Sequence, residues 1–474
     1  MRHARNNTAR VLAGWRRAAA LAAGAALAGC ALAPPPSTEQ LGETVAEHAP
    51  LPPAFVTPGA SPGHVEDGWL ATFADARLDE LVAEALAYNS DLRVAAARVE
   101  QAGAMVRVAG GKLYPTVDAL ARGGGEMSGD NSGLEGIGVT ASWELDLWGR
   151  VRYGTRVAKE QYASAQADLE FARQSLAALV AKSWFLATET VLQQAMLAEM
   201  VDAAENLQML AEQRLRVGIG SELDVATARV NVQNFRDSLR QVDLAHGQSL
   251  RALELLLGRY PAADVGVPRE LGSLAALEGG VPAGLPSELL ERRPDLIAAQ
   301  NRVAAAFSRV REAQAARLPR FSLTGGVSSI SSDLFVLEER DNPVWSIGAS
   351  LLAPLYAGGA LKAQVEVRSA EQQQAAAQYV STALAAFRDV ENALSSEAVL
   401  KDRETILTAA VADARRALEL AETRYRVGSA DLRAVQERQI DFHTARMNLL
   451  RVEAERRVQR VNLHLALGGD FAAG

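Results

Sequence analysis

The residues LRVG at positions 215–218 return 210 positions later as YRVG at positions 425–428. Farther along, LLG at 256–258 returns at the same offset as ALG at 466–468. A long stretch without proline precedes each copy, and a pair of alternating segments precedes that stretch. Self-similarity at a fixed offset indicates a duplicated structural unit. We therefore predict two repeats of one architecture.

Long helices are predicted on both sides of each glycine turn. The first repeat would hold a helix over 151–215 and a returning helix over 223–257, and the turn at 428–430 divides the second repeat in the same way. At 1.5 Å per residue the helix over 151–215 would extend about 100 Å. A shorter helix is expected before each strand pair, over 78–109 and 293–316. The predicted repeats cover residues 76–257 and 292–470, and a connector covers 258–291.

The strands are marked by regular alternation. In IGVTASWELDL (137–147) every odd position is apolar and every even position is small or polar, and WSIGASL (345–351) repeats the pattern 208 positions later. Partner strands are predicted at 117–121 and 321–325, offset by 204. Even offsets keep the same apolar face in all four strands. This period is typical of a transmembrane β-strand and of a half-buried soluble sheet, so the alternation alone leaves both open.

The N-terminus has the pattern of a bacterial lipoprotein signal. Five arginines precede an apolar run at 18–29 that is too short to span a bilayer, and LAGC at 27–30 resembles a lipobox. Cys30 is the single cysteine and the predicted acylation site, although an inert thiol after an ordinary signal peptide would look similar. Ala31 in place of aspartate resembles lipoproteins sorted to the outer membrane. Residues 1–29 are thus a predicted signal, and the proline-rich residues 30–75 a tether.

Composition argues against an enzyme, a metal protein and a nucleic-acid-binding protein. Hydrophobic residues make up 49% of the chain but aromatic residues only 5%, which suits close-packed helices. Removal of the signal would lower the net charge from −8 to about −13, which disfavours nucleic acid as a partner. A single cysteine, without an HExxH or Walker sequence, predicts no metal or cofactor site. The GxSxG sequence at 59–63 would make Ser61 a nucleophile only between a strand and a helix, and the loop around Pro62 supplies neither.

Four strands with an apolar face cannot sit alone in a bilayer, because their edge N–H and C=O groups would lack partners in hydrocarbon. If the sheet is transmembrane, strands from several copies must close a barrel whose strand number is a multiple of four. The polar positions would then face the lumen, where they would tune charge selectivity or simply be solvated. These positions are Asp118, Arg122, Glu144 and Asp146.

Five motifs, in this order, resemble those of TolC-like outer-membrane efflux factors, in the NodT-type lipoprotein branch that serves resistance-nodulation-division (RND) pumps. The resemblance covers nearly all of the chain after the signal. It implies an internally duplicated α+β membrane protein: a homotrimer whose 12-stranded β-barrel, with four strands per chain, continues into a long α-helical coiled-coil tunnel. The motifs are the lipobox ending at Cys30, ELDLWGR at 144–150, RLRVGIGS at 214–221, PLYAGG at 354–359 and RYRVGS at 424–429.

The resemblance also implies a function. The protein would be the exit channel of a tripartite efflux pump, lipid-anchored in the bacterial outer membrane and extending into the periplasm, and would passively conduct small molecules such as drugs to the outside. Its partners would be a periplasmic adaptor (membrane fusion protein) and an inner-membrane RND pump. A type I secretion exit duct uses the same kind of tunnel, and a periplasmic coiled-coil adaptor would share the helical hairpins, so both remain alternatives.

Site residues follow from the same resemblance. Related proteins close the tip with acidic rings after the second turn, but the aligned places here hold Ala434 and Glu437 rather than two aspartates. The gate candidates are therefore Asp431, Glu437 and Asp224, with ordinary solvated helix charges as the alternative. In the family the hairpin turns dock the adaptor, although these glycines could equally serve only to end helices. The docking candidates are Val217, Gly218, Ile219, Gly220, Ser221, Val427, Gly428 and Ser429.

Overall fold

The computed structural model describes residues 32–57, 63, 65, 67–122, 134–272, 281–332 and 344–472, apart from the side chains of 122, 134–136 and 329–332. The chain divides into two compact units. The strand unit contains residues up to 44 together with 97–166 and 298–381, and the hairpin unit contains 45–96, 167–297 and 382 onward. The predicted signal peptide, Cys30 and Ser61 lie outside the described residues.

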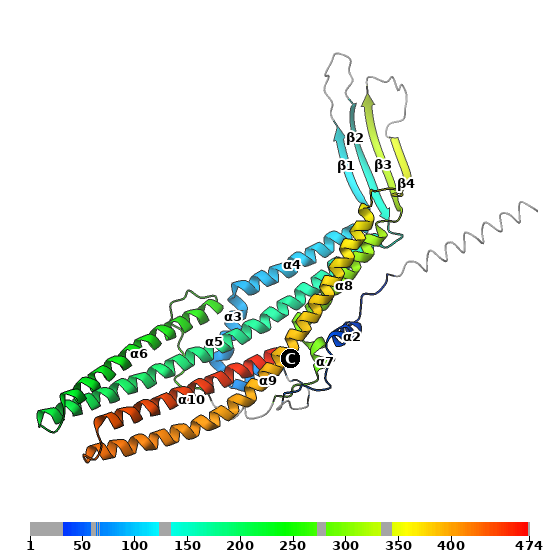
Figure 1. The fold of residues 1–474 in the computed structure, drawn as a ribbon. Helices are drawn as coiled ribbons and strands as arrows, with labels where there is room; N and C mark the ends of the chain where they lie inside the picture. Colours follow the sequence, from blue (N-terminus) through cyan, green and yellow to red (C-terminus); the bar gives the residue numbers. More distant parts are fainter. Residues whose placement is uncertain are drawn as a thin grey trace, which may run out of the picture. The chain divides into compact units, whose positions relative to one another are not determined.

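Figure 1 traces the elements along the chain. The N-terminal part and the first repeat hold α2 (Thr38–His48), the 3-10 helix η1 (Trp69–Phe73), α3 (Ala76–Tyr88), α4 (Ser90–Gly111), β1 (Thr116–Arg122), β2 (Leu134–Leu145), α5 (Arg150–Arg216) and α6 (Glu222–Leu256). The short helix α7 (Pro286–Arg292) lies at the end of the connector. The second repeat holds α8 (Pro294–Ala315), β3 (Arg320–Ser332), β4 (Val344–Leu352), α9 (Ala360–Arg426) and α10 (Leu432–Ala466).

The duplication is visible in the order and the length of the elements. Helix, strand pair, long helix and returning helix occur twice, as α4-β1-β2-α5-α6 and α8-β3-β4-α9-α10. Both long helices have 67 residues and both returning helices have 35. The predicted helical hairpins and strands are confirmed. The boundaries predicted for the repeats stay a prediction, since the two compact units divide the chain differently.

The single helix expected over 78–109 was wrong, because the chain breaks at Asn89. This residue leaves the helical region at the end of α3, and its side-chain oxygen accepts the Leu92 N–H at 3.0 Å, which caps α4. Its side-chain nitrogen donates to the Leu256 carbonyl at 2.9 Å. Asn89 therefore ends one helix, begins the next and fixes the break to the end of α6.

The four strands form one antiparallel sheet in the order β1-β2-β3-β4. The register joins Val117 to Ala141, Ala141 to Gly325 and Gly325 to Ile347, so odd-numbered residues lie opposite odd-numbered residues across the whole sheet. One face is therefore apolar in all four strands, as the even offsets predicted. That face is exposed, with Ile347 96% accessible; its other large exposed members are Val117, Ile137, Val139, Trp143, Leu323, Trp345 and Leu351.

The main core of the hairpin unit packs α3 against α5 and α6. Its largest members are Trp69, Leu78, Leu81, Trp184 and Leu253, which are almost fully buried. The indole N–H of Trp184 donates to Asp75 at 2.8 Å, and the same aspartate caps α3. Among the described helices, α5 alone is long and apolar enough to cross a membrane, but 56% of that window is buried within the protein, as in a core helix.

Candidate functional site

The first hairpin turn joins α5 to α6. Gly218 adopts a left-handed φ of 81°, and the N–H groups of Ile219 and Gly220 both donate to the Arg214 carbonyl at 3.0 Å. Ser221 then begins α6 with a capping box that includes Asp224. Backbone N–H and C=O groups that lack a helical partner at the end of α5 and the start of α6 therefore find hydrogen-bond partners within the turn. Because these bonds use only the backbone and the cap, the side chains of Val217 and Ile219 project outward and are exposed.

The second turn joins α9 to α10 with a similar but distinct path. Gly428 has a φ of 77°, and the N–H and hydroxyl of Ser429 donate to the Arg424 carbonyl at 2.9 and 3.1 Å. A Cβ atom on Gly220 would lie 2.7 Å from the Leu215 nitrogen, whereas the matching position in the second turn is Ala430. The close approach at Gly220 is therefore a feature of the first turn alone. Adaptor docking at these turns stays a prediction.

A small core joins the two hairpins just behind the turns. The guanidinium of Arg214 lies 4.7 Å from the ring centroid of Tyr425, which is 5% exposed. Burial raises the pKa of the Tyr425 hydroxyl, against the opposing charge of Arg214. In the sequence both residues stand out only as members of the turn motifs at 214–221 and 424–429. The core contains Ala211, Val225, Ala228, Tyr425, Leu432 and Val435.

Each of the three gate candidates has a partner within its own hairpin. Asp431 is the N-cap of α10, and its carboxylate accepts the Ala434 N–H at 2.9 Å. Asp224 accepts the Ser221 N–H at 3.4 Å, and Glu437 forms an ion pair with Arg433 at 3.0 Å. Two of the three carboxylates therefore cap helix N-termini, where negative charge is stabilising. Their role as a gate stays a prediction.

The lumen candidates lie at different places in the strand unit. Asp118 is on the even-numbered face of β1, opposite Thr140. The side chain of Arg122 lies outside the described residues. Glu144 is on the same face near the end of β2, and Asp146 lies one residue beyond that strand. A lumenal position for these residues stays a prediction. Glu144 and Asp146 also make contacts beyond the sheet.

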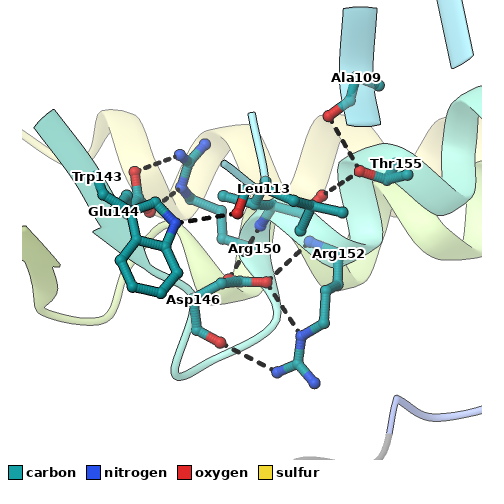
Figure 2. Close-up of polar contacts among 9 residues, drawn as sticks. Ala109, Leu113, Trp143, Glu144, Asp146, Arg150, Arg152 and Thr155 are labelled. Carbon is teal, nitrogen blue, oxygen red and sulfur yellow. Dashed lines mark hydrogen bonds and ion pairs between the residues drawn. The ribbon is translucent and has the colours of Figure 1, made fainter. Parts of the chain in front are cut away.

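Glu144 and Asp146 fix the junction between the sheet and α5 (Figure 2). The Glu144 carboxylate accepts two hydrogen bonds from Arg150, at 2.9 and 2.7 Å, and these bonds raise the Arg150 pKa. The Asp146 carboxylate accepts the N–H groups of Val151 and Arg152 at 3.1 and 2.8 Å and pairs with the Arg152 guanidinium. Asp146 thus acts as an N-terminal cap of α5 as well as an ion-pair partner.

Neighbouring contacts extend this junction to α4. The Trp143 indole N–H donates to the Leu113 carbonyl at 3.0 Å, and the Thr155 hydroxyl donates to the Ala109 carbonyl at 3.2 Å (Figure 2). The end of α4 is therefore bonded to both β2 and α5. These contacts connect the sheet to both α4 and α5.

Comparison with known proteins agrees with this geometry. The chain matches the outer membrane efflux protein family over residues 81–259 and 285–469. It is 30% identical over 457 residues to the toluene efflux pump outer membrane protein TtgC of Pseudomonas putida, covering 94% of this chain and 93% of that protein. It is 29% identical to the cation efflux system protein CusC of Escherichia coli, with 94% of this chain and 97% of that protein covered.

Solved structures share the fold over most of the chain. The outer-membrane channel OprN aligns with a TM-score of 0.80 and 27% identity, covering 89% of this chain and 97% of OprN. The MtrE outer membrane channel of Neisseria gonorrhoeae aligns with a TM-score of 0.79 and 28% identity, covering 89% and 98%. With both repeats matched by the family, the chain belongs to the outer membrane efflux protein family and is an outer-membrane efflux channel.

Proposed function

We propose that three copies of this chain close a 12-stranded barrel, the β4 edge of one copy pairing with the β1 edge of the next. The observation that carries this proposal is the sheet itself, which has an exposed apolar face and, among the described residues, no strand paired to the outer edge of β1 or β4. In hydrocarbon each unsatisfied backbone group costs several kcal/mol, so the edges must be paired. Head-to-tail pairing of different edges generates a closed ring.

Within this assembly the protein would act as a passive duct rather than an enzyme. The energy for transport would come from an inner-membrane RND pump, linked through a periplasmic adaptor that docks at the hairpin turns. Exposed valines support docking there, since Val217 and Val427 are 70% and 74% accessible at the ends of the hairpins. Small apolar side chains beside exposed turn backbone suit a partner that packs against the tip.

The cargo would be small molecules. TtgC is named for toluene efflux and CusC for cation efflux, and this chain is about equally similar to both. Drug-like and solvent-like compounds are the class proposed here, with acylation of Cys30 adding a lipid anchor. A type I secretion duct would instead pass polypeptides, and transport assays with both cargo classes separate the two.

Three measurements test the channel. Native mass spectrometry of the detergent-solubilised protein should give a trimer, planar bilayers should show conductance, and cells lacking their own exit channel should regain drug efflux when the cognate adaptor and pump are supplied. A protein that is monomeric and shows no conductance would contradict the proposal.

A double substitution tests adaptor docking at the hairpin turns separately. Replacing both tip valines, Val217→Asp with Val427→Asp, should abolish efflux while conductance persists, because the partner surface is lost but the barrel is not. Val56→Asp is the matched control, since Val56 is 77% exposed in the tether. If the control loses efflux equally, the tips are not the docking site.

A further inference from the structure

A polar cavity of about 580 Å³ lies between α5, α9 and α10 of the hairpin unit. Its volume falls in the range of about 300–1,000 Å³ that is typical of small-ligand pockets. Phe171 of α5 forms an apolar part of the lining. The polar side chains recur on α9 and α10 at the helical spacing of three and four, which places each row on one face of its helix. These residues are Asp389, Asn392, Ser395 and Ser396 on α9 and Gln459 and Asn462 on α10.

The α9 row has hydrogen-bonding groups that no part of the described chain engages. A helical hydroxyl commonly donates to the carbonyl one turn earlier, as Thr405 does to Lys401 at 3.2 Å farther along the same helix. Among the described residues, the hydroxyls of Ser395 and Ser396 find no such acceptor, and the side-chain amide of Asn392 finds no partner. These donors and acceptors are therefore available to a ligand.

The α10 row is oriented by a short chain of hydrogen bonds. Lys182 donates to the side-chain oxygen of Asn462 at 3.1 Å, and the Asn462 side-chain nitrogen donates to the side-chain oxygen of Gln459 at 3.2 Å. The side-chain nitrogen of Gln459 is left as a donor that has no acceptor within the described ranges. The cavity thus presents amide and hydroxyl groups from two helices.

The charged residues that line the cavity are already paired. Arg293 is buried, and its guanidinium donates to the Asp295 carboxylate at 3.0 and 2.8 Å and to the Ala466 carbonyl at 3.2 Å. Asp389 accepts a hydrogen bond from Arg388 at 2.9 Å and lies 3.8 Å from Arg293. An ionic ligand would have to compete with these pairs and lose its own hydration, so the lining favours a neutral ligand.

The equivalent place in the first repeat has a different chemistry. Both repeats have the same helix lengths, so offset 210 identifies the matching positions. Most of the polar positions are apolar there: Asp389, Ser395, Ser396 and Asn462 correspond to Leu179, Phe185, Leu186 and Ala252, in this order. A gap left by helix packing alone would not require this change. The polar lining is therefore a property of the second repeat and not of the scaffold that the two repeats share.

We propose that this cavity binds a neutral sugar. Sugar hydroxyls both donate and accept hydrogen bonds, as do the side chains of Asn392, Ser395 and Ser396, and they bring no charge into the site. The C–H face of a sugar ring can pack against the apolar surface of Phe171. All of the lining residues belong to the hairpin unit of one copy, so the site adds a binding function to the exit duct proposed above.

The test measures the binding of chitotriose and of maltotriose to the full-length protein by isothermal titration calorimetry, in a polyoxyethylene detergent without a sugar headgroup. Chitotriose carries an acetamido group on each ring and maltotriose carries only hydroxyls, so the pair shows which chemistry the amides of the site select. At least one of them should bind saturably, with one site per chain. Retention of the protein on chitin or amylose beads then distinguishes a polymeric glycan from a soluble sugar. Failure of both trisaccharides to bind overturns the proposal.

Two variants locate the binding. Asn392→Ala with Gln459→Ala removes an amide from each helix and should weaken the affinity at least about tenfold. Ser396→Leu introduces the residue of the first repeat, fills part of the cavity and should abolish binding. Thermal unfolding of both variants checks that they fold.

Thr405→Ala is the matched control, because Thr405 lies on the same helix and its hydroxyl already donates to the Lys401 carbonyl. It should leave the affinity unchanged. An unchanged affinity in the folded double variant, or an equal loss in the control, overturns the assignment to this cavity. Conductance, measured on the same samples, reports separately on the channel.

Discussion

The two helical hairpins have equal lengths, but the α9–α10 hairpin contains ion pairs whose arginines are buried, beside the half-exposed pair of Arg403 with Glu455. In the α5–α6 hairpin, Arg229 pairs with Glu212 at 2.8 Å and Arg236 with Glu205 at 2.6 Å, and both arginines are more than half exposed. In the α9–α10 hairpin, Arg456 pairs with Glu404 and Arg460 with Glu397, and both arginines are buried, at 7% and 6% exposed. Duplication preserved the scaffold while the interior chemistry diverged.

The largest effect should come from breaking a buried pair. Arg460→Met leaves Glu397 partly buried without its cation, and removal of one partner of such a pair costs about 3 kcal/mol. The equivalent change in the exposed hairpin, Arg236→Met, should cost less than about 1 kcal/mol. Denaturant unfolding of the detergent-solubilised protein measures both. The double variant Arg460→Met with Glu397→Leu should recover most of the loss, and a failure to recover would indicate that the pair is not the cause.

Acid should weaken the α9–α10 hairpin. Burial lowers the pKa of His443 and of His464 to about 4, helped by Arg446 and Arg460 respectively. Because the unfolded imidazole has a pKa of about 6.5, the unfolded chain binds protons first as the pH falls. The stability contributed by each neutral histidine is thus full above about pH 6.5 and is lost progressively toward pH 4, by up to about 3 kcal/mol each.

Replacement of one histidine checks this expectation. His464 stacks on Trp69 with ring centroids 6.0 Å apart, so His464→Phe keeps an aromatic ring there without a proton site. The variant should show a flatter loss of stability between pH 6.5 and pH 4, followed by thermal unfolding across that range. An unchanged slope would mean that His464 does not titrate as its burial implies.

Offset 210 places Glu254 of α6 at the position of His464 in α10. Glu254 is fully buried, and its carboxylate accepts the N–H groups of Ala263 and Asp264, both at 2.7 Å. Burial alone would raise its pKa, but these donors lower it overall, so its contribution is present above about pH 4.5 and is lost as the pH falls further.

Replacement of this carboxylate should loosen the connector. Glu254→Gln keeps the shape but weakens two charge-assisted bonds, at a cost of about 1–3 kcal/mol. Hydrogen exchange of residues 262–265 should accelerate. Glu366→Gln, an exposed glutamate on α9, is the control and should change neither exchange nor stability. Equal effects of the two substitutions would contradict the assignment.

The sequence predicted the parts of this molecule that repeat or alternate, and missed those that depend on a single side chain. The offsets of 204, 208 and 210 were sufficient for the strands, their common face and the hairpins. Asn89 was missed because a helix break by side-chain capping leaves the apolar period almost undisturbed. Arg456 and Arg460 were missed because periodicity treats arginine as a surface residue, and only their acidic partners on α9 permit burial. Asp146 continues the alternation of polar residues in the strand, but it lies beyond the end of the strand and caps α5.

The smallest effect concerns the two turns. A Cβ atom on Gly220 would lie 2.7 Å from the Leu215 nitrogen and 2.9 Å from the Arg214 carbonyl carbon, closer than real Cβ atoms come. Gly220→Ala must therefore shift the first turn, and should lower the free energy of unfolding by about 1 kcal/mol. In the second turn, Ala430→Gly gives the unfolded chain more backbone freedom, and it should cost at most a few tenths of a kcal/mol beyond that entropic contribution. Hydrogen exchange should rise in residues 214–221 of the first variant. If hydrogen exchange changes alike in both turns, the asymmetry between them has no structural basis at this position. Differences in partner docking would then have to come from the exposed side chains, Ile219 in the first turn and Ser429 in the second.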